Sequence, residues 1–360
     1  MIPLYKPYMP EVPLVDEILH SGQLAYGKYG KEFERLLREF FTVENLIVTN
    51  SYNLAILVSL SALGIQPGDT VIASPMACLT STQPLLSAGI NIRWGDVDPA
   101  TGTLSPDSVL NLMPIKPKAI IHNHFCGFVG YVDEINEIGR EYGVPVIDDC
   151  IEAFGSEYKG RKLGNTSAIQ VSDITVFSFN AVRVPNTLDG GAIVFKSKEL
   201  FEKSLLIRDA GIDRSCFRDS LGEINPDCDI SLIGHSATMD EVKGYIGSRQ
   251  MTKVDWILKR QRQNALAWDQ ILMNDDNLIP IKSKTCQPNY WVYGTLAKNK
   301  SEAIVRYRNK GFYASGVHIN NNIYSVFKDK SRLPGVNEFN GRFVALPCGW
   351  WADIENADRI

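Results

Sequence analysis

Polar side chains that could do chemistry follow several of the apolar runs in this sequence. Asp149 comes just after the run 144–147, Glu152 stands three residues further on, and Ser178 lies at the end of the run 175–179. A carboxylate can stabilise a cationic ring nitrogen or carry a proton, and a serine hydroxyl can bind phosphate. Asp is also a favoured helix N-cap, and Ser178 is also compatible with an ordinary strand end. We favour a functional role for Asp149.

Two histidines and a cysteine alternate at the end of another apolar run. His122 and His124 are followed by Cys126. Residues two apart on a strand share one face, so both imidazoles could reach a common ion. No third ligand is evident, so we predict no metal site.

Short apolar runs alternate with helical patterns along the first half of the chain. Strands are predicted at residues 46–50, 70–73, 119–122, 144–147, 175–179 and 192–195, and helices between them at positions such as 54–63 and 132–142. This alternation predicts an α/β fold with a doubly wound, mostly parallel sheet. Ligands of such sheets bind outside the carboxyl ends of the strands, where Asp149 and Ser178 are expected.

A long helical pattern without proline runs from Met239 to about Leu272. We predict that it leads from a large α/β domain, residues 1–240, into a smaller C-terminal α+β domain, residues 241–360. A long surface helix within one domain is the alternative. The sequence contains neither a G-x-G-x-x-G motif nor a Walker A motif, so nucleotide binding of the Rossmann kind has no support.

The composition, 44% hydrophobic and 22% charged residues, is that of an ordinary globular protein. A net charge of −4 without a basic cluster argues against a nucleic-acid partner. No apolar run approaches the ~20 residues that span a bilayer, and the N-terminus does not resemble a signal peptide. The seven cysteines include no C-x-x-C pair, which predicts neither a disulfide framework nor a zinc site, and most are expected to be buried and reduced. We expect a cytoplasmic enzyme.

The stretch 178–192 reads SFNAVRVPNTLDGGA. It resembles the lysine-bearing loop of the DegT/DnrJ/EryC1/StrS family of sugar aminotransferases, which use pyridoxal phosphate (PLP). Arg183 stands where that loop has its lysine. A lysine amine can form a Schiff base and then shuttle a proton. A guanidinium stays protonated and can do neither, although it can hold a phosphate or a carboxylate by a bidentate contact.

The resemblance extends over nearly the whole chain. Further stretches that look like family motifs are 21–27 (SGQLAYG), 63–69 (LGIQPGD), 158–164 (YKGRKLG) and 206–214 (LIRDAGIDR). The resemblance implies a PLP-transferase fold of type I, with a mostly parallel sheet in a large domain and a smaller C-terminal domain. It also implies that Asp149 pairs with the pyridine nitrogen of the cofactor and that Ser178 binds its phosphate.

The remaining cofactor positions depart from the family pattern. Tyr52 replaces a glycine of the phosphate cradle, which restricts the backbone and adds bulk, while Asn53 can still donate to an anion. Cys78 stands where many members have an aromatic ring over the cofactor, and a buried apolar thiol is its alternative role. Ser236 and Thr238 stand where a second subunit supplies phosphate contacts in the family.

The substrate side has changed as well. The stretch 318–322 resembles a family H-x-R-N-D motif, so His318 is retained and Asn320 replaces an arginine that could hold an anionic group. With lysine absent, another group must carry protons in any catalytic reaction. Glu152 stands where the family usually has Gln or His, and His124 and His235 are the other candidates near cofactor or substrate.

The missing lysine leaves alternatives open. In the first, the protein binds PLP or its amine form (PMP) without a covalent link and performs amino transfer or dehydration on a nucleotide-linked keto sugar, as family dehydratases with histidine at this position do. In the second, it is a PLP-independent or catalytically silent homologue that binds sugar nucleotides. An engineered change of one lysine is disfavoured, because several other positions depart too. We expect the first alternative, in a homodimer with its active site at the interface, in surface-polysaccharide, lipopolysaccharide or deoxysugar biosynthesis.

Overall fold

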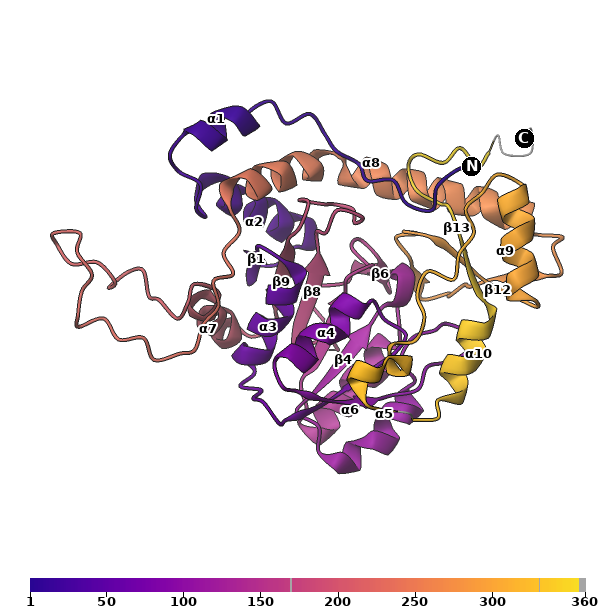
Figure 1. The fold of residues 1–360 in the computed structure, drawn as a ribbon, viewed down its shortest axis with the longest axis horizontal. Helices are drawn as coiled ribbons and strands as arrows, with labels where there is room; N and C mark the ends of the chain where they lie inside the picture. Colours follow the sequence, from indigo (N-terminus) through magenta and orange to yellow (C-terminus); the bar gives the residue numbers. More distant parts are fainter. Residues whose placement is uncertain (169, 330, 356–360) are drawn as a thin grey trace.

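The computed structural model describes residues 1–168, 170–329 and 331–355, and a seven-stranded sheet lies at its centre (Figure 1). The strands, in spatial order, are β1 (Leu46–Thr49), β9 (Gly191–Phe195), β8 (Ile174–Ser178), β5 (Val146–Cys150), β4 (Ala119–Asn123), β2 (Thr70–Ala73) and β3 (Asn91–Trp94). Strand β9 runs antiparallel to both of its neighbours, and the pairs among β8, β5, β4, β2 and β3 are parallel. The prediction of a mostly parallel α/β sheet is confirmed.

Helices cover both faces of this sheet, because successive strand residues point to opposite sides. In β1, Ile47 packs into the core under α3 (Tyr52–Ala62) and α4 (Leu79–Ser87). Its neighbours Leu46 and Val48 pack against α2 and α8 instead. The covering helices of that second face are α2 (Lys28–Phe41), α8 (Glu241–Ile271), α5 (Pro106–Leu112) and α6 (Val132–Tyr142).

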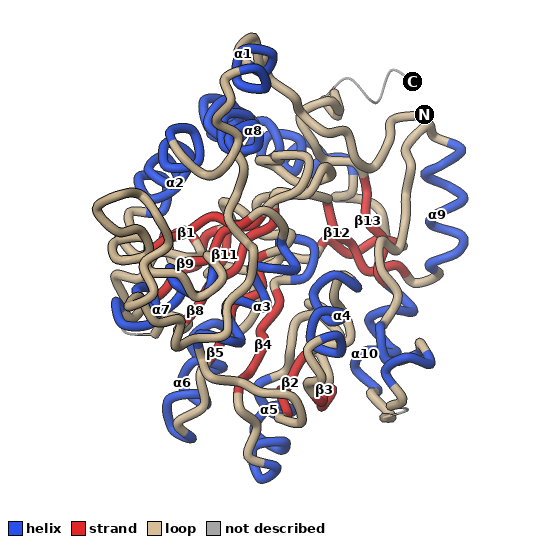
Figure 2. The backbone as a smooth tube through the Cα atoms, turned by 60° about the vertical axis from the view of Figure 1, so that its left-hand side comes forward, coloured by secondary structure: helices blue, strands red, loops and turns tan. Residues whose placement is uncertain are grey.

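A second, antiparallel sheet follows the long helix α8 and lies beside the first (Figure 2). Its strands are β10 (Leu278–Pro280), β12 (Tyr293–Ala297) and β13 (Phe343–Leu346), with α9 (Lys300–Asn309) and α10 (Pro334–Arg342) around them. The two regions are joined by α8, in which Leu258 packs into the core of the first and Trp268 into the core of the second. A third, small sheet connects the two regions: strand β11 (Cys286–Gln287) pairs with β6 (Glu157–Tyr158), which in turn pairs with β7 (Arg161–Lys162). The domain boundary at residue 240 stays a prediction.

A long segment between α7 (Lys198–Arg208) and α8 extends away from the body of the molecule (Figure 1). A disulfide between Cys216 and Cys228 closes it, so the expectation of reduced cysteines is wrong for this pair. The reason is local: the segment folds back on itself and brings the two Cα atoms within 5.6 Å. Of the cysteines outside the disulfide, Cys126, Cys150 and Cys348 are buried, whereas Cys78 and Cys286 are partly exposed, so fewer than half of the seven are buried and reduced.

The remaining helical elements are short: α1 (Val15–His20), η1 (Met113–Ile115), η2 (Phe125–Gly127), η3 (Asn321–Ile323) and η4 (Ser325–Phe327). Within the described residues, no helix combines the length and the apolar character that a bilayer crossing requires. Strand β5 begins at Val146 and ends at Cys150, later than predicted, so Asp149 lies inside the strand. No helix of the described chain starts there, and the alternative of a helix N-cap for Asp149 is wrong.

Candidate functional site

The candidate site lies at the carboxyl ends of the parallel strands, where the sequence placed it. On β5, Asp149 points to the face covered by α3, as its contact with Tyr52 shows. Ser178 ends β8 and is buried, and its Oγ accepts a hydrogen bond from the backbone N–H of Asn180 at 3.3 Å. Strand alternation therefore positions the polar groups, and buried aliphatic neighbours hold the strands in register.

Asp149 is engaged by the side chain of Tyr52. Its Oδ1 accepts hydrogen bonds from the Tyr52 hydroxyl at 2.5 Å and from the backbone N–H of Ile151 at 3.0 Å. Both side chains are buried, and burial raises the pKa of the Asp149 carboxyl and that of the Tyr52 phenol. The second oxygen, Oδ2, is buried and has no hydrogen-bond partner among the described residues.

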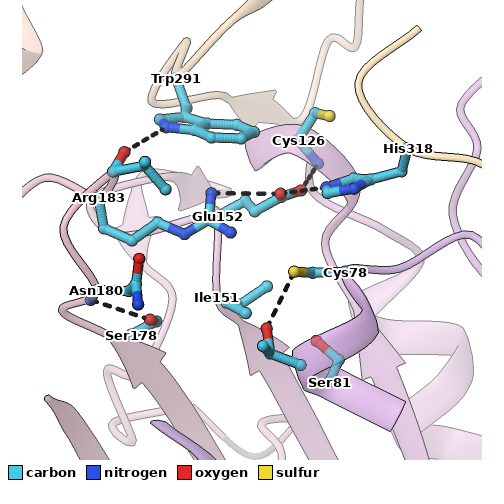
Figure 3. A network of polar contacts seen from close by, with 12 residues as sticks. Cys78, Ser81, Cys126, Ile151, Glu152, Ser178, Asn180, Arg183, Trp291 and His318 are labelled. Atoms are coloured by element: carbon cyan, nitrogen blue, oxygen red, sulfur yellow. Dashed lines mark hydrogen bonds and ion pairs between the residues drawn. The ribbon is translucent and has the colours of Figure 1, made fainter. Parts of the chain in front are cut away.

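Arg183 lies close to the side chain of Glu152 (Figure 3). The shortest contact, between Arg183 Nη1 and Glu152 Oε1, is an ion pair of 3.3 Å. Glu152 Oε1 also meets His318 Nε2 at 2.7 Å, and Oε2 accepts the backbone N–H of Cys126 at 2.7 Å. Burial opposes ionisation of Glu152, but His318, Arg183 and the Cys126 N–H outweigh it and lower its pKa to about 2. Glu152 is therefore an ionised acceptor.

An aromatic ring lies against Arg183, and a second ring stacks on the first. The guanidinium carbon of Arg183 lies 4.4 Å from the centre of the Trp291 ring, and Tyr5 stacks on Trp291 at 4.6 Å. Trp291 is fixed by its indole N–H, which donates to the Val182 carbonyl at 3.1 Å (Figure 3). Sequence reasoning missed both rings, because neither stands near a recognisable motif. The aromatic run at 290–293 was the one available signal.

Arg183 makes no hydrogen bond through its side chain to any described residue. Its Nε and Nη1 are buried without a hydrogen-bond partner among the described residues, and the whole residue is 6% exposed. A cavity of about 10 Å³, bordered by Glu152, Ser178, Arg183 and Trp291, lies beside it. Such a volume has room for about one water molecule.

The structure gives a direct test of whether PLP fits. By the resemblance, the cofactor spans two anchors: the N-terminus of α3, which meets its phosphate, and Asp149, which meets its ring nitrogen. Tyr52 is the first residue of α3, and its side chain reaches from that N-terminus to Asp149. The phenol hydroxyl donates to the carboxylate in the way that a protonated ring nitrogen would. With Tyr52 in this position, and with Arg183 where the resemblance places the lysine, the residues present do not fit PLP.

The two histidines of the alternating motif form a separate buried cluster. His122 Nδ1 lies 3.0 Å and His124 Nε2 3.4 Å from the same oxygen of Asp148. His124 Nδ1 also accepts the backbone N–H of Gly130 at 3.0 Å. Asp148 is buried and lies on the face of β5 opposite Asp149, so it is structural rather than solvated. Potential metal-ligating atoms of these three side chains lie within 4.8 Å of one another, so Asp148 is the third candidate ligand that the sequence did not reveal. His122 Nδ1 and Asp148 share a hydrogen bond, and the Nε2 atoms of both histidines are buried without a hydrogen-bond partner among the described residues.

His124 therefore contacts neither Glu152 nor Arg183 directly among the described contacts. His235 lies further away: its Nε2 is 3.2 Å from Ser61 Oγ, roughly 14 Å along α3 from Tyr52. Its role in binding substrate stays a prediction.

The other predicted residues lie around the rim or engage local partners. Cys78 is half-buried, with its Sγ 3.0 Å from Thr80 Oγ1, and Figure 3 places it below the Arg183 guanidinium. Asn53 is exposed on the first turn of α3. Asn320 donates to Asn322 Oδ1 at 2.6 Å and accepts from Asn340 at 3.0 Å.

Ser236 is exposed and accepts a hydrogen bond at its carbonyl from Asn50 at 3.2 Å. It lies in the long segment between α7 and α8, close to the start of α8. Its expected role, to bind a phosphate across a subunit interface, concerns a second chain and stays a prediction.

Comparison with known proteins gives the same family. The model of the DegT/DnrJ/EryC1/StrS aminotransferase family matches residues 9–360. The chain is 30% identical over 280 residues to the UDP-4-amino-4,6-dideoxy-N-acetyl-beta-L-altrosamine transaminase of Campylobacter jejuni, covering 76% of this chain and 70% of that protein. It is 28% identical over 308 residues to the GDP-perosamine synthase of Escherichia coli O157:H7, covering 84% and 79%.

Solved structures agree. The sugar aminotransferase CalS13 from Micromonospora echinospora superposes with a TM-score of 0.90 at 27% identity, covering 99% of this chain and 97% of that one. Sequence motifs, fold and relatives point the same way. The chain belongs to the DegT/DnrJ/EryC1/StrS aminotransferase family.

Proposed function

We propose that this protein is a PLP-independent member of its family that binds a nucleotide-linked sugar. The observation that carries the proposal is the hydrogen bond from the Tyr52 hydroxyl to Asp149. The chain's own phenol takes the carboxylate that the family uses for the cofactor ring. A tyrosine in this position supports the proposal that the site no longer binds PLP.

The surroundings of Arg183 support the same conclusion. A guanidinium cannot form a Schiff base, and this one is held between Glu152 and the Trp291 ring. Glu152, the nearest candidate for a proton carrier, is ionised with a pKa of about 2. A carboxylate so stabilised is a weak base near neutral pH, because efficient general bases have pKa values near the working pH.

We infer a sugar-nucleotide ligand from the relatives of this chain and from the position of the site on the sheet. The relatives named above are a UDP-sugar transaminase and a GDP-perosamine synthase. The polar groups of the site stand at the carboxyl ends of the strands, where α/β folds bind ligands. We place the protein in the cytoplasm, in surface-polysaccharide or deoxysugar biosynthesis, as a homodimer with the site at its interface. Light scattering coupled to gel filtration tests the dimer.

One observation favours a second candidate, an enzyme that binds PLP or PMP without a covalent link and acts on a keto sugar. Asp149 Oδ2 is buried without a partner, so one oxygen remains for a ring N–H. This candidate requires the Tyr52 side chain to swing out of its buried position, which breaks the hydrogen bond to Asp149.

The deciding experiment compares cofactor retention. Purified protein is incubated with PLP and, separately, with PMP, then dialysed and examined by absorbance and native mass spectrometry. We expect neither form to be retained by the wild type. Retention without an adduct after borohydride reduction would support the second candidate.

A matched set of variants separates the effect of the Tyr52 side chain from the effect of lacking a lysine amine at residue 183. Tyr52→Gly should admit PLP without a covalent link, and Tyr52→Gly combined with Arg183→Lys should yield a borohydride-reducible adduct. Arg183→Lys alone should not yield this adduct, because the Tyr52 hydroxyl still forms its hydrogen bond with the Asp149 carboxylate. A reducible adduct in Arg183→Lys alone would contradict the proposal.

A further inference from the structure

We propose that Arg183 binds a carboxylate of the ligand, so that the ligand is a nucleotide-linked sugar acid. The inference rests on the proposed function, because it names the class of sugar that the same site binds. It begins from a buried guanidinium whose donors lack acceptors.

A guanidinium carries five N–H donors, and nearly all buried donors in native proteins have a partner. Arg183 is 6% exposed, and its Nε and Nη1 have no hydrogen-bond partner among the described residues. Other arginines, such as Arg208, also leave Nε unpaired, so the unpaired Nη1 is the donor that distinguishes Arg183. The contact with Glu152 is an ion pair at 3.3 Å without hydrogen-bond geometry. Leaving such donors unpaired costs stability, which a ligand that supplies acceptors would recover.

The geometry favours a carboxylate as that acceptor. The guanidinium carbon lies 4.4 Å from the centre of the Trp291 ring, and the planar fork of a guanidinium can donate two parallel hydrogen bonds to one carboxylate. Glu152 already places one negative charge beside Arg183. A singly charged carboxylate meets less repulsion from Glu152 than a doubly charged phosphate would.

The ligand would approach from the side of Asn180 and Cys78. Asn180 is exposed, Cys78 is half-buried and the His318 side chain is 19% exposed, so this side of the guanidinium is the open one. In Figure 3, Asn180 and Cys78 flank the space below Arg183, with Ile151 at its floor. The cavity of about 10 Å³ that Ile151, Arg183 and Trp291 line has no room for a sugar ring.

The test uses matched ligands that differ at one carbon. UDP-glucuronic acid and UDP-glucose differ in a carboxylate against a hydroxymethyl group, and GDP-mannuronic acid and GDP-mannose form a second pair. We expect isothermal titration calorimetry to give affinities about 10- to 100-fold higher for the acid in the better-binding pair, the range expected for hydrogen bonds to charged groups.

Variants assign the preference to Arg183. Arg183→Met should bind acid and neutral sugar alike, and Arg183→Lys should keep part of the preference, since the charge remains and the fork is lost. Arg262→Met is the control, because Arg262 pairs with Glu157 away from this site and should leave the preference unchanged. Retained affinity for the neutral sugar shows that Arg183→Met still folds.

The outcomes are distinct. If no sugar nucleotide binds the wild type, the proposed function fails. If acid and neutral sugars bind the wild type equally, or if Arg183→Met keeps the preference, the function stands and this inference is overturned.

Discussion

Two buried arginine–glutamate pairs have the same ingredients and different bonding. Arg208 and Arg183 are each 6% exposed, each faces a glutamate that is at least 95% buried, and each lies over an aromatic ring. Arg208 Nη1 donates to Glu34 Oε1 at 2.6 Å and to the Val48 carbonyl at 3.1 Å. The Arg183 guanidinium has a 3.3 Å ion pair and no hydrogen bond to a described residue; Nε lacks a partner in both arginines, and Nη1 lacks one only in Arg183.

The difference follows from position. Arg208 sits beside β1, where a strand carbonyl is at hand, and Glu34 also accepts the backbone N–H of Val48 at 3.0 Å. Arg183 stands in the loop after β8, at the open ends of the strands. The first pair therefore stabilises the fold, and the second is arranged for a ligand. Polar groups that are satisfied contribute to stability, and those left short of partners mark a site.

The largest effect expected from this comparison is on stability. Arg208→Met removes the hydrogen bonds of a buried guanidinium to Glu34 and to the Val48 carbonyl, leaves Glu34 with Arg38 as its remaining charge partner, and should lower the free energy of unfolding by about 3–5 kcal/mol. Arg183→Met should cost less, about 1–3 kcal/mol, because Glu152 keeps its contact with His318. Urea unfolding monitored by circular dichroism measures both. Equal losses would mean that Arg183 is as structural as Arg208.

The second prediction concerns acid. Glu152 has a pKa of about 2 in the folded protein and ~4.3 when unfolded, so its ionised form stabilises the fold at and above pH ~4.3. That stabilisation is lost as the pH falls from ~4.3 toward 2, by about 3 kcal/mol at ~1.4 kcal/mol per pKa unit. Glu152→Gln should flatten the fall of unfolding free energy over this interval. The same slope in variant and wild type would place the acid sensitivity elsewhere.

The third prediction extends the comparison to the other buried carboxylate of the site. Tyr52→Phe removes the hydroxyl that donates to Asp149 and should cost about 1–3 kcal/mol of unfolding free energy. The pKa of Asp149, already raised by burial, should rise further because a hydrogen bond to its ionised form is lost. A double-mutant cycle with Asp149→Asn measures the coupling, and additive losses would argue against the bond.

The smallest effect is expected at a partly exposed pair. Arg262 meets Glu157 at 3.0 Å, with both side chains 24% exposed. Arg262→Met should change the free energy of unfolding by about 1 kcal/mol or less, because solvent screens such pairs. A loss comparable to that of Arg208→Met would show that burial does not determine which of the three arginines contributes most to the free energy of unfolding.

Local sequence was enough for most of the elements. The predicted helix 132–142 coincides with α6, whose end is fixed by Gly143 at φ 65°. The strand 70–73 coincides with β2 after its Pro-Gly turn. The start of β5 was predicted two residues early, because an apolar run does not reveal where pairing with β4 begins. Ser178 ends β8, as predicted, whereas Asp149 lies inside β5, next to its carboxyl end, rather than after it.

The chemical state of the site was beyond local reasoning. That Tyr52 replaces a glycine is visible in the sequence, but not that its hydroxyl reaches Asp149. Trp291 comes after α8 in the sequence and Arg183 comes before it, and no motif indicates that the two side chains are in contact. His124 was expected at the site and instead shares Asp148 with His122, because its ring lies on the other face of the sheet.

The sequence by itself determined the family, the α/β architecture and the absence of a lysine at residue 183. These depend on local motifs and on hydrophobic periodicity, which are written along the chain. Only the tertiary structure decided that Tyr52 occupies the carboxylate of Asp149, and that Arg183 is buried beneath Trp291 with donors to spare. Hydrogen bonds and burial are set by neighbours distant in sequence, so they exist only once the strands and helices have packed.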